Sequence, residues 1–164
     1  MKRYFLLFIL LFSLFSCEED VKFNNPTFQA TKDNVFWRAV QAIATVNSGG
    51  SLVIEAYTAT EVVVLKTNSA AVGTYSLGTS PTRSVSYVYT DPETKETINF
   101  STGSPSPGSN AGNGEIVITD YDAVAKTISG TFKFNLVNTF DDPLVAPTMN
   151  FQHGVFYKLP VTIK

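Results

Sequence analysis

The sequence has very few of the side chains on which most nucleophilic and metal chemistry depends. Its 164 residues include one cysteine, Cys17, and one histidine, His153. A chain with a single cysteine cannot form an intramolecular disulfide, so its stability has to come from a packed core. Zinc is also disfavoured, because carboxylates would have to fill most of the ligand positions around His153. No metal and no cofactor is predicted.

Charge is scarce as well, and basic charge does not dominate. Only 16% of the residues are Asp, Glu, Lys or Arg, and the formal net charge is −2. A nucleic-acid-binding protein would need a basic face, and a domain held to anionic lipid by charge would need a basic patch. Nucleic acid is therefore not expected as a partner, and charge is not expected to hold the chain on a membrane.

Long apolar runs are limited to one, Tyr4–Phe15, and this run is too short to span a bilayer. A spanning helix needs about 20 apolar residues, whereas here Glu18-Glu19-Asp20 follow almost at once. Two basic residues precede the run, and the small Ser16 stands before Cys17. This order is typical of a secretory signal. With cysteine at the cleavage point, it predicts a lipoprotein signal peptide over residues 1–16.

Cys17 is therefore predicted to be acylated, with diacylglycerol and a palmitate-type chain, and to become the new N-terminus. The alternative is a conventional signal peptide that merely contains a cysteine. Two or three acyl chains hold a protein durably on a membrane, where one chain does not. Residues 17–26 are predicted to form the lipidated cysteine and an acidic tether, and residues 27–164 a single domain. Removing 16 of the 164 residues leaves 148, which is enough for one core.

The remaining chain is typical of a β protein. Gly, Asn, Asp, Ser and Pro recur about every ten residues between runs rich in Val, Ile, Thr, Tyr and Phe. The clearest strand is Thr127–Val137, where strict alternation puts Ile128, Gly130, Phe132, Phe134 and Leu136 on one face. Leu52–Thr58 and Val62–Lys66 are predicted to form a hairpin. We expect an all-β fold, a single antiparallel β-sandwich or closed β-barrel of about 8–10 strands.

Three segments are harder to assign. Residues 34–46 fit both a helix and a strand, and only the β context favours a strand. Ser101–Gly114, rich in Gly, Ser, Pro and Asn, is predicted to be a long loop. Near the C-terminus, one parity is shared by Met149, Phe151, Val155, Tyr157 and Leu159. His153 interrupts this pattern, and the following Gly154 suggests a bulge.

Candidate catalytic residues are few. His153 has no serine in a Gly-x-Ser-x-Gly context to activate, so we interpret it as structural or superficial. Calcium could be considered at Asp120 with Asp122, or at Asp141-Asp142, but these aspartates are typical of turns. A glycosidase would need two facing carboxylates. The glutamates available for such a pair are Glu55, Glu61, Glu96 and Glu115, and no pairing is visible in the sequence.

Aromatic side chains are plentiful and offer another kind of site. Rings exposed on a β surface are good platforms for sugars or apolar ligands. The tentative ligand surface consists of Trp37, Tyr57, Tyr87 and Tyr89. The alternative is that these rings fill the core and cross-strand pairs.

Several blocks of strand and turn residues are distinctive, namely Gly73-Thr74-Tyr75-Ser76-Leu77, Gly114–Thr119 and Thr127–Phe134, with Phe28-x-Ala30 and Trp37-x-Ala39 ahead of them. These blocks resemble a family of small uncharacterised lipoproteins from Bacteroidetes. The resemblance extends from about Phe28 to Phe156. His153-Gly154-Val155-Phe156 departs from the Gly-Ser-Phe-like turn expected in members. Glu18-Glu19-Asp20 also resembles the signal that sends lipoproteins of that phylum to the cell surface. The resemblance implies no catalytic residues.

The favoured function is therefore non-catalytic. We expect a lipid-anchored module of the cell envelope, on the outer membrane and with surface exposure left open, that binds a glycan or a protein or has a structural role. The alternative is a β-barrel carrier of a small apolar ligand, with a cavity lined by Ile128, Phe132 and Phe134. A third possibility is a glycan-directed hydrolase, which would need converging carboxylates or His153 with an acid.

Overall fold

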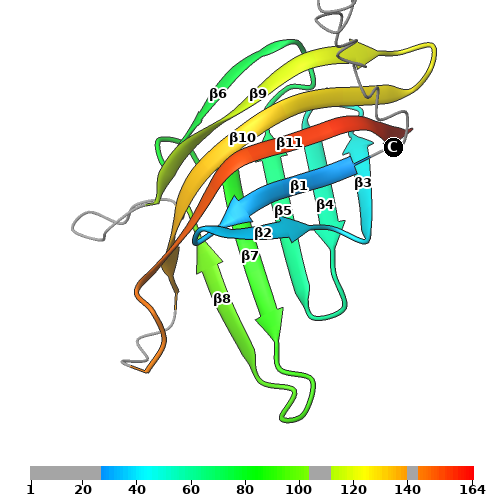
Figure 1. Ribbon diagram of the computed structural model, residues 1–164. Coiled ribbons are helices and arrows are strands. Elements are labelled where there is room, and N and C mark those ends of the chain that lie inside the picture. Colours follow the sequence, from blue (N-terminus) through cyan, green and yellow to red (C-terminus); the bar gives the residue numbers. More distant parts are fainter. Residues whose placement is uncertain (1–26, 104–111, 140–143) are drawn as a thin grey trace, which may run out of the picture.

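The computed structural model describes residues 27–103, 112–139 and 144–164, and all regular structure in these residues is β-strand (Figure 1). In the described residues, no helix is long and apolar enough to cross a membrane. The expected all-β fold is confirmed. Cys17, the tether and Asp141-Asp142 lie outside the described residues. The strands are β1 (Thr27–Lys32), β2 (Val35–Arg38), β3 (Gln41–Val46), β4 (Leu52–Tyr57), β5 (Glu61–Thr67), β6 (Gly73–Leu77), β7 (Ser84–Thr90), β8 (Thr97–Ser101), β9 (Asn113–Asp122), β10 (Thr127–Asn138) and β11 (Thr148–Ile163).

The strands form one continuous mixed sheet that folds over into two layers. Strands β2-β1-β11-β10-β9-β6 form the front layer in Figure 1, and β3-β4-β5-β7-β8 form the back layer. The layers join at two corners. The end of β11 pairs in parallel with β3 at Val161–Ile163, and the end of β10 pairs with β8 at Val137 and Asn138. The arrangement is sandwich-like rather than a clean barrel.

This topology differs from the prediction in two details. The described chain has 11 strands instead of 8–10, and the contact between β11 and β3 is parallel rather than antiparallel. The parallel contact follows from the length of β11, which continues beyond Tyr157, the partner of Thr27 at the start of β1, and reaches the other layer. Long strands that change layers are a usual way to make the corners of packed sheets.

Aromatic rings fill the space between the layers. Phe132 stacks on Phe28 with 4.8 Å between ring centroids, and Phe134 lies 5.4 Å from Phe132 and 4.9 Å from Phe151. A methyl group added at Gly154 would come within 2.3 Å of the Phe132 ring, so a glycine is required beneath that ring. The predicted inward face of β10 is confirmed, because its members are all buried: Ile128, Gly130, Phe132, Phe134 and Leu136.

The single parity predicted for the C-terminal strand is wrong. The register of β11 against β10 shifts twice, and His153 and Lys158 adopt φ angles of 52° and 46° near these shifts. Each bulge inserts an extra residue and exchanges the two faces of the strand. Gly154 is consequently buried, while Val155 faces outward and is half-buried. The left-handed residue of the first bulge is His153 and not the glycine that follows it.

The segment 34–46 is confirmed as extended, but it forms two strands that belong to different layers. Strand β2 points Trp37 into the core and leaves Phe36 exposed. The chain then crosses to the back layer, where Val40 N–H donates to the carbonyl of Tyr57 at 2.8 Å and β3 begins. The interruption of the strand pattern at Gln41 therefore marks the crossing between layers.

Two further predictions concern the hairpin and the long loop. The hairpin is confirmed as β4 and β5, which pair from Tyr57 and Val62 to Leu52 and Thr67. Of the predicted loop, β8 takes up Ser101 and β9 begins at Asn113, while residues 104–111 lie outside the described part.

Candidate functional site

Polar side chains from both layers meet at the carboxylate of Glu61. This residue begins β5 in the back layer, next to the turn that follows β4. The front layer supplies Lys32, at the end of β1, and Trp37, in β2, and both donate hydrogen bonds to the carboxylate. The phenol of Tyr87, from β7, donates at 2.6 Å, and the ammonium of Lys32 also lies 3.2 Å from the Tyr87 hydroxyl. These four residues lie at one end of the space between the two layers, and together we call them the mouth cluster.

The mouth cluster keeps its carboxylate ionised. Burial raises the pKa of Glu61, but hydrogen bonds from Lys32, Tyr87 and Trp37 outweigh burial, and the pKa lies below the ordinary glutamate value. Burial, followed by the hydrogen bond to Glu61 and its charge, raises the pKa of Tyr87 well above the ordinary tyrosine value. Glu61 is therefore an acceptor at neutral pH and Tyr87 a donor.

The interactions of this cluster are suited to holding strands together and do not match those of a general acid. A general acid needs a raised carboxyl pKa, whereas the pKa of Glu61 is lowered. The ammonium of Lys32 also lies 5.2 Å from the centroid of the Tyr87 ring, close enough for a cation–π contact. These bonds hold the β1–β2 hairpin against β5 and β7, at one end of the space between the layers.

The prediction of a tentative ligand surface is wrong for two of its four residues. Trp37 and Tyr87 are only 6% and 2% exposed, so neither lies on a surface. They fill the core, the alternative given above, because strand parity turns both rings inward. Tyr89 shares that inward face and lies opposite Glu61 in the β5–β7 pairing, at the half-buried rim of the mouth. Tyr57 belongs to the outer face of β4, beside Glu55, where burial and then the Glu55 charge raise its pKa.

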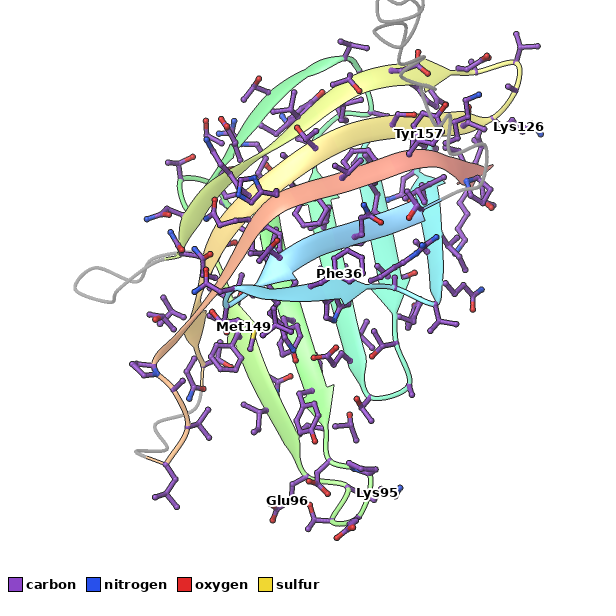
Figure 2. All side chains as sticks on the ribbon, viewed as in Figure 1. Phe36, Lys95, Glu96, Lys126, Met149 and Tyr157 are labelled. Carbon is purple, nitrogen blue, oxygen red and sulfur yellow. The ribbon has the colours of Figure 1, made fainter. Side chains whose placement is uncertain are left out.

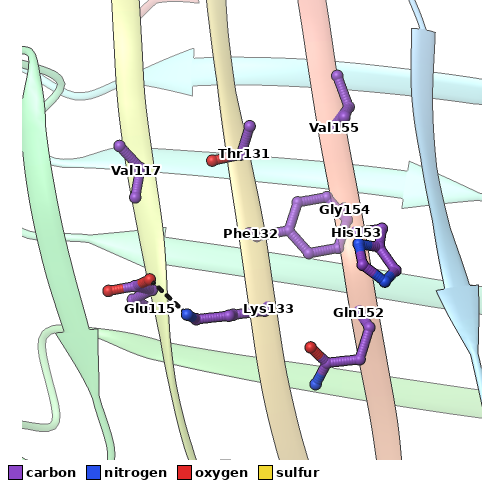
Figure 3. A pocket seen from close by; sticks show the side chains of 9 residues that line it. All are labelled: Glu115, Val117, Thr131, Phe132, Lys133, Gln152, His153, Gly154 and Val155. Atoms are coloured by element: carbon purple, nitrogen blue, oxygen red, sulfur yellow. Dashed lines mark ion pairs between the residues drawn. The ribbon is translucent and has the colours of Figure 1, made fainter.

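An open groove lies on the outer face of the front layer, across β9, β10 and β11 (Figure 3). Its volume is about 590 Å³. The first bulge of β11 shapes one side of it, and there the exposed ring of His153 stands beside Gln152. The lining residues are Glu115, Val117, Thr131, Phe132, Lys133, Gln152, His153, Gly154 and Val155.

The groove combines polar groups with apolar walls. On one side, Lys133 Nζ and Glu115 form an ion pair at 3.0 Å, and Thr131 offers a hydroxyl. Val117 and Val155 supply apolar surface. His153 is held in a left-handed conformation that a non-glycine residue adopts at a cost of about 1–3 kcal/mol. Five other non-glycine residues of the described chain also have positive φ angles, so the groove is the candidate for ligand binding because of its polar and apolar lining and not because of this strain.

Two of these sites were only partly visible in the sequence. Glu61 was considered as a carboxylate, but its partner Lys32 is 29 residues away and belongs to a different strand, so no local pattern connects them. His153 was interpreted as structural or superficial, and its exposed position in a bulge of β11 agrees with that interpretation. The groove beside its ring was missed, because the groove depends on the pairing of β9, β10 and β11.

The carboxylates considered for metal binding or hydrolysis are distributed over the molecule. Asp122 accepts hydrogen bonds from the backbone N–H groups of Val124 and Ala125, each at 2.8 Å, which confirms its turn role. Glu55 lies in an open groove on the outer face of the back layer, whereas Glu61 faces inward. Among the described residues, no group of three or more His, Cys, Asp or Glu side chains is arranged to hold a metal ion.

Comparison with known protein families gives one match. Residues 24–160 match a family described as a domain of unknown function, DUF6252. The chain belongs to this family. No curated protein and no solved structure matches it. The DUF6252 match covers every described strand except the last residues of β11, so the layers, the mouth cluster and the groove all belong to the family domain.

Proposed function

We propose that this chain is a non-catalytic recognition module, held on the cell envelope by an acyl anchor at Cys17. The signal-like residues 1–16 and the lipoprotein resemblance support an outer-membrane location, with the acidic Glu18-Glu19-Asp20 favouring the cell surface. The same resemblance supports an origin in Bacteroidetes. In this arrangement, residues 17–26 tether the β domain to the membrane.

The observation that carries the proposal is the packed aromatic core. A carrier of small apolar ligands would need a cavity around Ile128, Phe132 and Phe134, but these side chains are at most 3% exposed and the two rings stack on their neighbours. Packing of this kind among the described residues argues against a ligand-sized cavity around these side chains. It supports recognition by the outer surface rather than by the interior.

The outer groove suits a short glycan. Sugars are bound by hydrogen-bonding side chains that surround a patch of apolar or planar groups. The groove offers Glu115, Lys133 and Gln152 as hydrogen-bonding groups, and the His153 ring and Val155 as flat or apolar surface. A hydrolase is the weaker alternative, because the Glu115 carboxylate is already paired with Lys133.

The anchor can be tested by replacing the acylated residue. We expect Cys17→Ser to leave the protein unacylated, so that it accumulates as precursor or loses its partition into the detergent phase of a Triton X-114 extract. The acyl chains supply the membrane affinity, at about 0.8 kcal/mol per buried methylene. Ser16→Ala is the matched control, because it keeps a small residue at the cleavage point. Equal detergent partitioning of Cys17→Ser and the wild type would refute the anchor.

The groove can be tested with a glycan array probed by the full-length protein in detergent micelles. We expect His153→Gly to weaken binding of any recognised glycan at least tenfold, because it removes the ring while suiting the left-handed backbone. Lys133→Ala should weaken it too. Lys66→Ala, an exposed lysine of the back layer, is the control. Unchanged affinities in His153→Gly and Lys133→Ala, or the absence of any glycan ligand, would overturn the assignment.

A further inference from the structure

The free edge of β2 is exposed and apolar, and it lies on the far side of β1 from the groove, because Phe36 pairs with Thr31 and Thr31 pairs with Gln152. Among the described strands, β2 pairs only with β1, and it is one end of the sheet. Val35 is 65% exposed, Phe36 is 67% exposed, and Val40, just beyond the strand, is 86% exposed. Exposed, unprotected edge strands are the usual template for pairing with another chain.

The pairing pattern of the β1–β2 hairpin identifies which backbone groups are free. Ala39 N–H donates to the carbonyl of Phe28, so this pair is hydrogen-bonded. Opposed residues of an antiparallel pair alternate between bonded and non-bonded. The Thr31–Phe36 and Gln29–Arg38 pairs are therefore non-bonded, and the N–H and C=O groups of Phe36 and Arg38 point away from β1. No hydrogen bond within the described part of the chain involves them.

Below this edge, part of the inner face of the back layer has no strand over it. The β4–β5 and β7–β8 hairpins extend beyond β2 in Figure 1. Their inward residues there include Tyr89 and Ile98, which oppose each other in the β7–β8 pairing and are half-buried. Trp37 in β2 reaches Glu61, the direct neighbour of Tyr89, so this surface begins at the free edge of β2.

The start of β11 closes one end of this surface. The backbone N–H of Asp33, in the turn before β2, donates to the carbonyl of Asn150 at 2.9 Å, and Asn150 N–H donates to the Asp33 carboxylate. Met149, the neighbour of Asn150, is half-buried and lies near the start of β2 in Figure 2. Tyr89 and Ile98 together form what we call the apolar shelf, and Tyr89 adjoins the mouth cluster through its pairing with Glu61.

We infer that the edge of β2 and the apolar shelf bind an extended peptide segment of another protein, added as an antiparallel strand. The peptide backbone would pair with Phe36 and Arg38, the mode known as β-augmentation. Its inward residues, opposite Val35, Trp37 and Ala39, would be apolar and cover Tyr89 and Ile98. Its outward residue opposite Arg38 would be acidic, because Arg38 is exposed and has no ion-pair partner among the described residues.

A second copy of the chain fits this edge poorly. Two antiparallel β2 strands would be related by a twofold axis perpendicular to the sheet, which places both back layers on the same side. The β4–β5 and β7–β8 hairpins of each copy project beyond the edge and would meet the hairpins of the other (Figure 1). A single extended segment avoids this collision.

The test is a selection from a phage-displayed library of nine-residue peptides that alternate apolar and polar positions. The target is the full-length protein in detergent micelles, and empty micelles serve to remove peptides that bind detergent. Enriched peptides are synthesised, labelled with fluorescein and titrated by fluorescence anisotropy. We expect micromolar binding and an Asp or Glu at one outward position. Arg38→Glu should shift that preference to Lys or Arg.

Two variants locate the binding. Phe36→Pro removes the outward N–H at an edge position that tolerates proline, and Ile98→Lys places a charge on the apolar shelf. Each should weaken peptide binding at least tenfold, and Ile98→Lys decides the matter if Phe36→Pro does not fold. Val72→Lys is the control, since Val72 is also 65% exposed but lies beside β6, the other edge strand.

Three outcomes would overturn the inference. They are the absence of any enriched peptide, affinities that are equal in Phe36→Pro, Ile98→Lys and the wild type, and self-association in sedimentation that Phe36→Pro abolishes. The last would assign the edge to a second copy. None of these outcomes bears on the glycan groove or on the acyl anchor, which are tested separately with the variants at His153 and Cys17.

Discussion

At the scale of single residues, the largely buried carboxylate of Glu61 depends on the neighbours that bond to it. Its side chain is 13% exposed and that of its partner Lys32 is 23% exposed, so the pair is largely removed from water. Such a pair is weak evidence for net stabilisation, but removing one partner leaves an uncompensated charge. Trp37, Tyr87 and the hydroxyl of Thr58 donate the other hydrogen bonds to the carboxylate.

We expect Glu61→Gln to lower the free energy of unfolding at pH 7 by about 2–3 kcal/mol, because Lys32 loses its counter-charge. The pKa of Glu61 is lower in the folded chain than the ordinary value of 4.5. Its stabilising effect is thus present above that value and is lost as the pH falls through the folded pKa. The difference between wild type and variant should shrink below about pH 4.5, as measured by urea unfolding from pH 7 to 3.

Glu115→Gln is the matched control for this experiment. Glu115 also pairs with a lysine, but the side chains of Lys133 and Glu115 are 59% and 36% exposed. Exposed pairs contribute about 0–1 kcal/mol. If the two variants lost equal stability, or if the Glu61→Gln difference persisted at pH 3, the account of the mouth cluster would be wrong.

At the scale of elements, local patterns predict a strand well where the strand itself contains no bulge. Strand β10 alternates strictly and was predicted correctly, because the extra residue at each of its register shifts lies in β9 or β11. Strand β11 is also rich in apolar residues, but its two bulges exchange the faces at His153 and Lys158. A left-handed histidine or lysine has no distinctive sequence signal, whereas the glycine next to it drew the prediction to the wrong residue.

The exposure of the aromatic rings likewise depends on packing that no local pattern shows. The sequence could indicate that Trp37, Tyr87 and Tyr89 are unusual, but not which of them is covered. Trp37 and Tyr87 are buried because another layer lies over them, and Tyr89, of the same parity as Tyr87, is only half-buried because β2 is the last strand above it. The exposed fraction of a ring on a strand is decided by where the opposite layer ends.

At the scale of the whole molecule, the two corners join the layers into one sheet. At the corner between β11 and β3, Val161 is 5% exposed and Lys164 N–H donates to the carbonyl of Val46 at 3.0 Å. We expect deletion of residues 161–164 to lower the free energy of unfolding by about 2–4 kcal/mol, from the loss of a buried valine and several ladder hydrogen bonds. Urea unfolding followed by circular dichroism measures this change.

Ile163→Thr provides the comparison for the deletion. Ile163 belongs to the same strand end but is 60% exposed, so its replacement should change stability by no more than about 0.5 kcal/mol. A deletion that cost no more than this substitution would mean that the corner contributes little, and that the layers are held together by the aromatic core alone.

The sequence by itself determined the class of fold and the inward face of β10. Period-two alternation and turn residues act locally, so β10 and the β4–β5 hairpin were predictable from their own residues. The sequence also carries the signal on which the anchor at Cys17 is proposed. Only the tertiary structure decided the partners of Glu61, the position of the groove beside His153 and the free edge at Phe36. Each of these depends on which distant strands become neighbours, and hydrogen-bonded pairing between strands leaves no local trace in the chain.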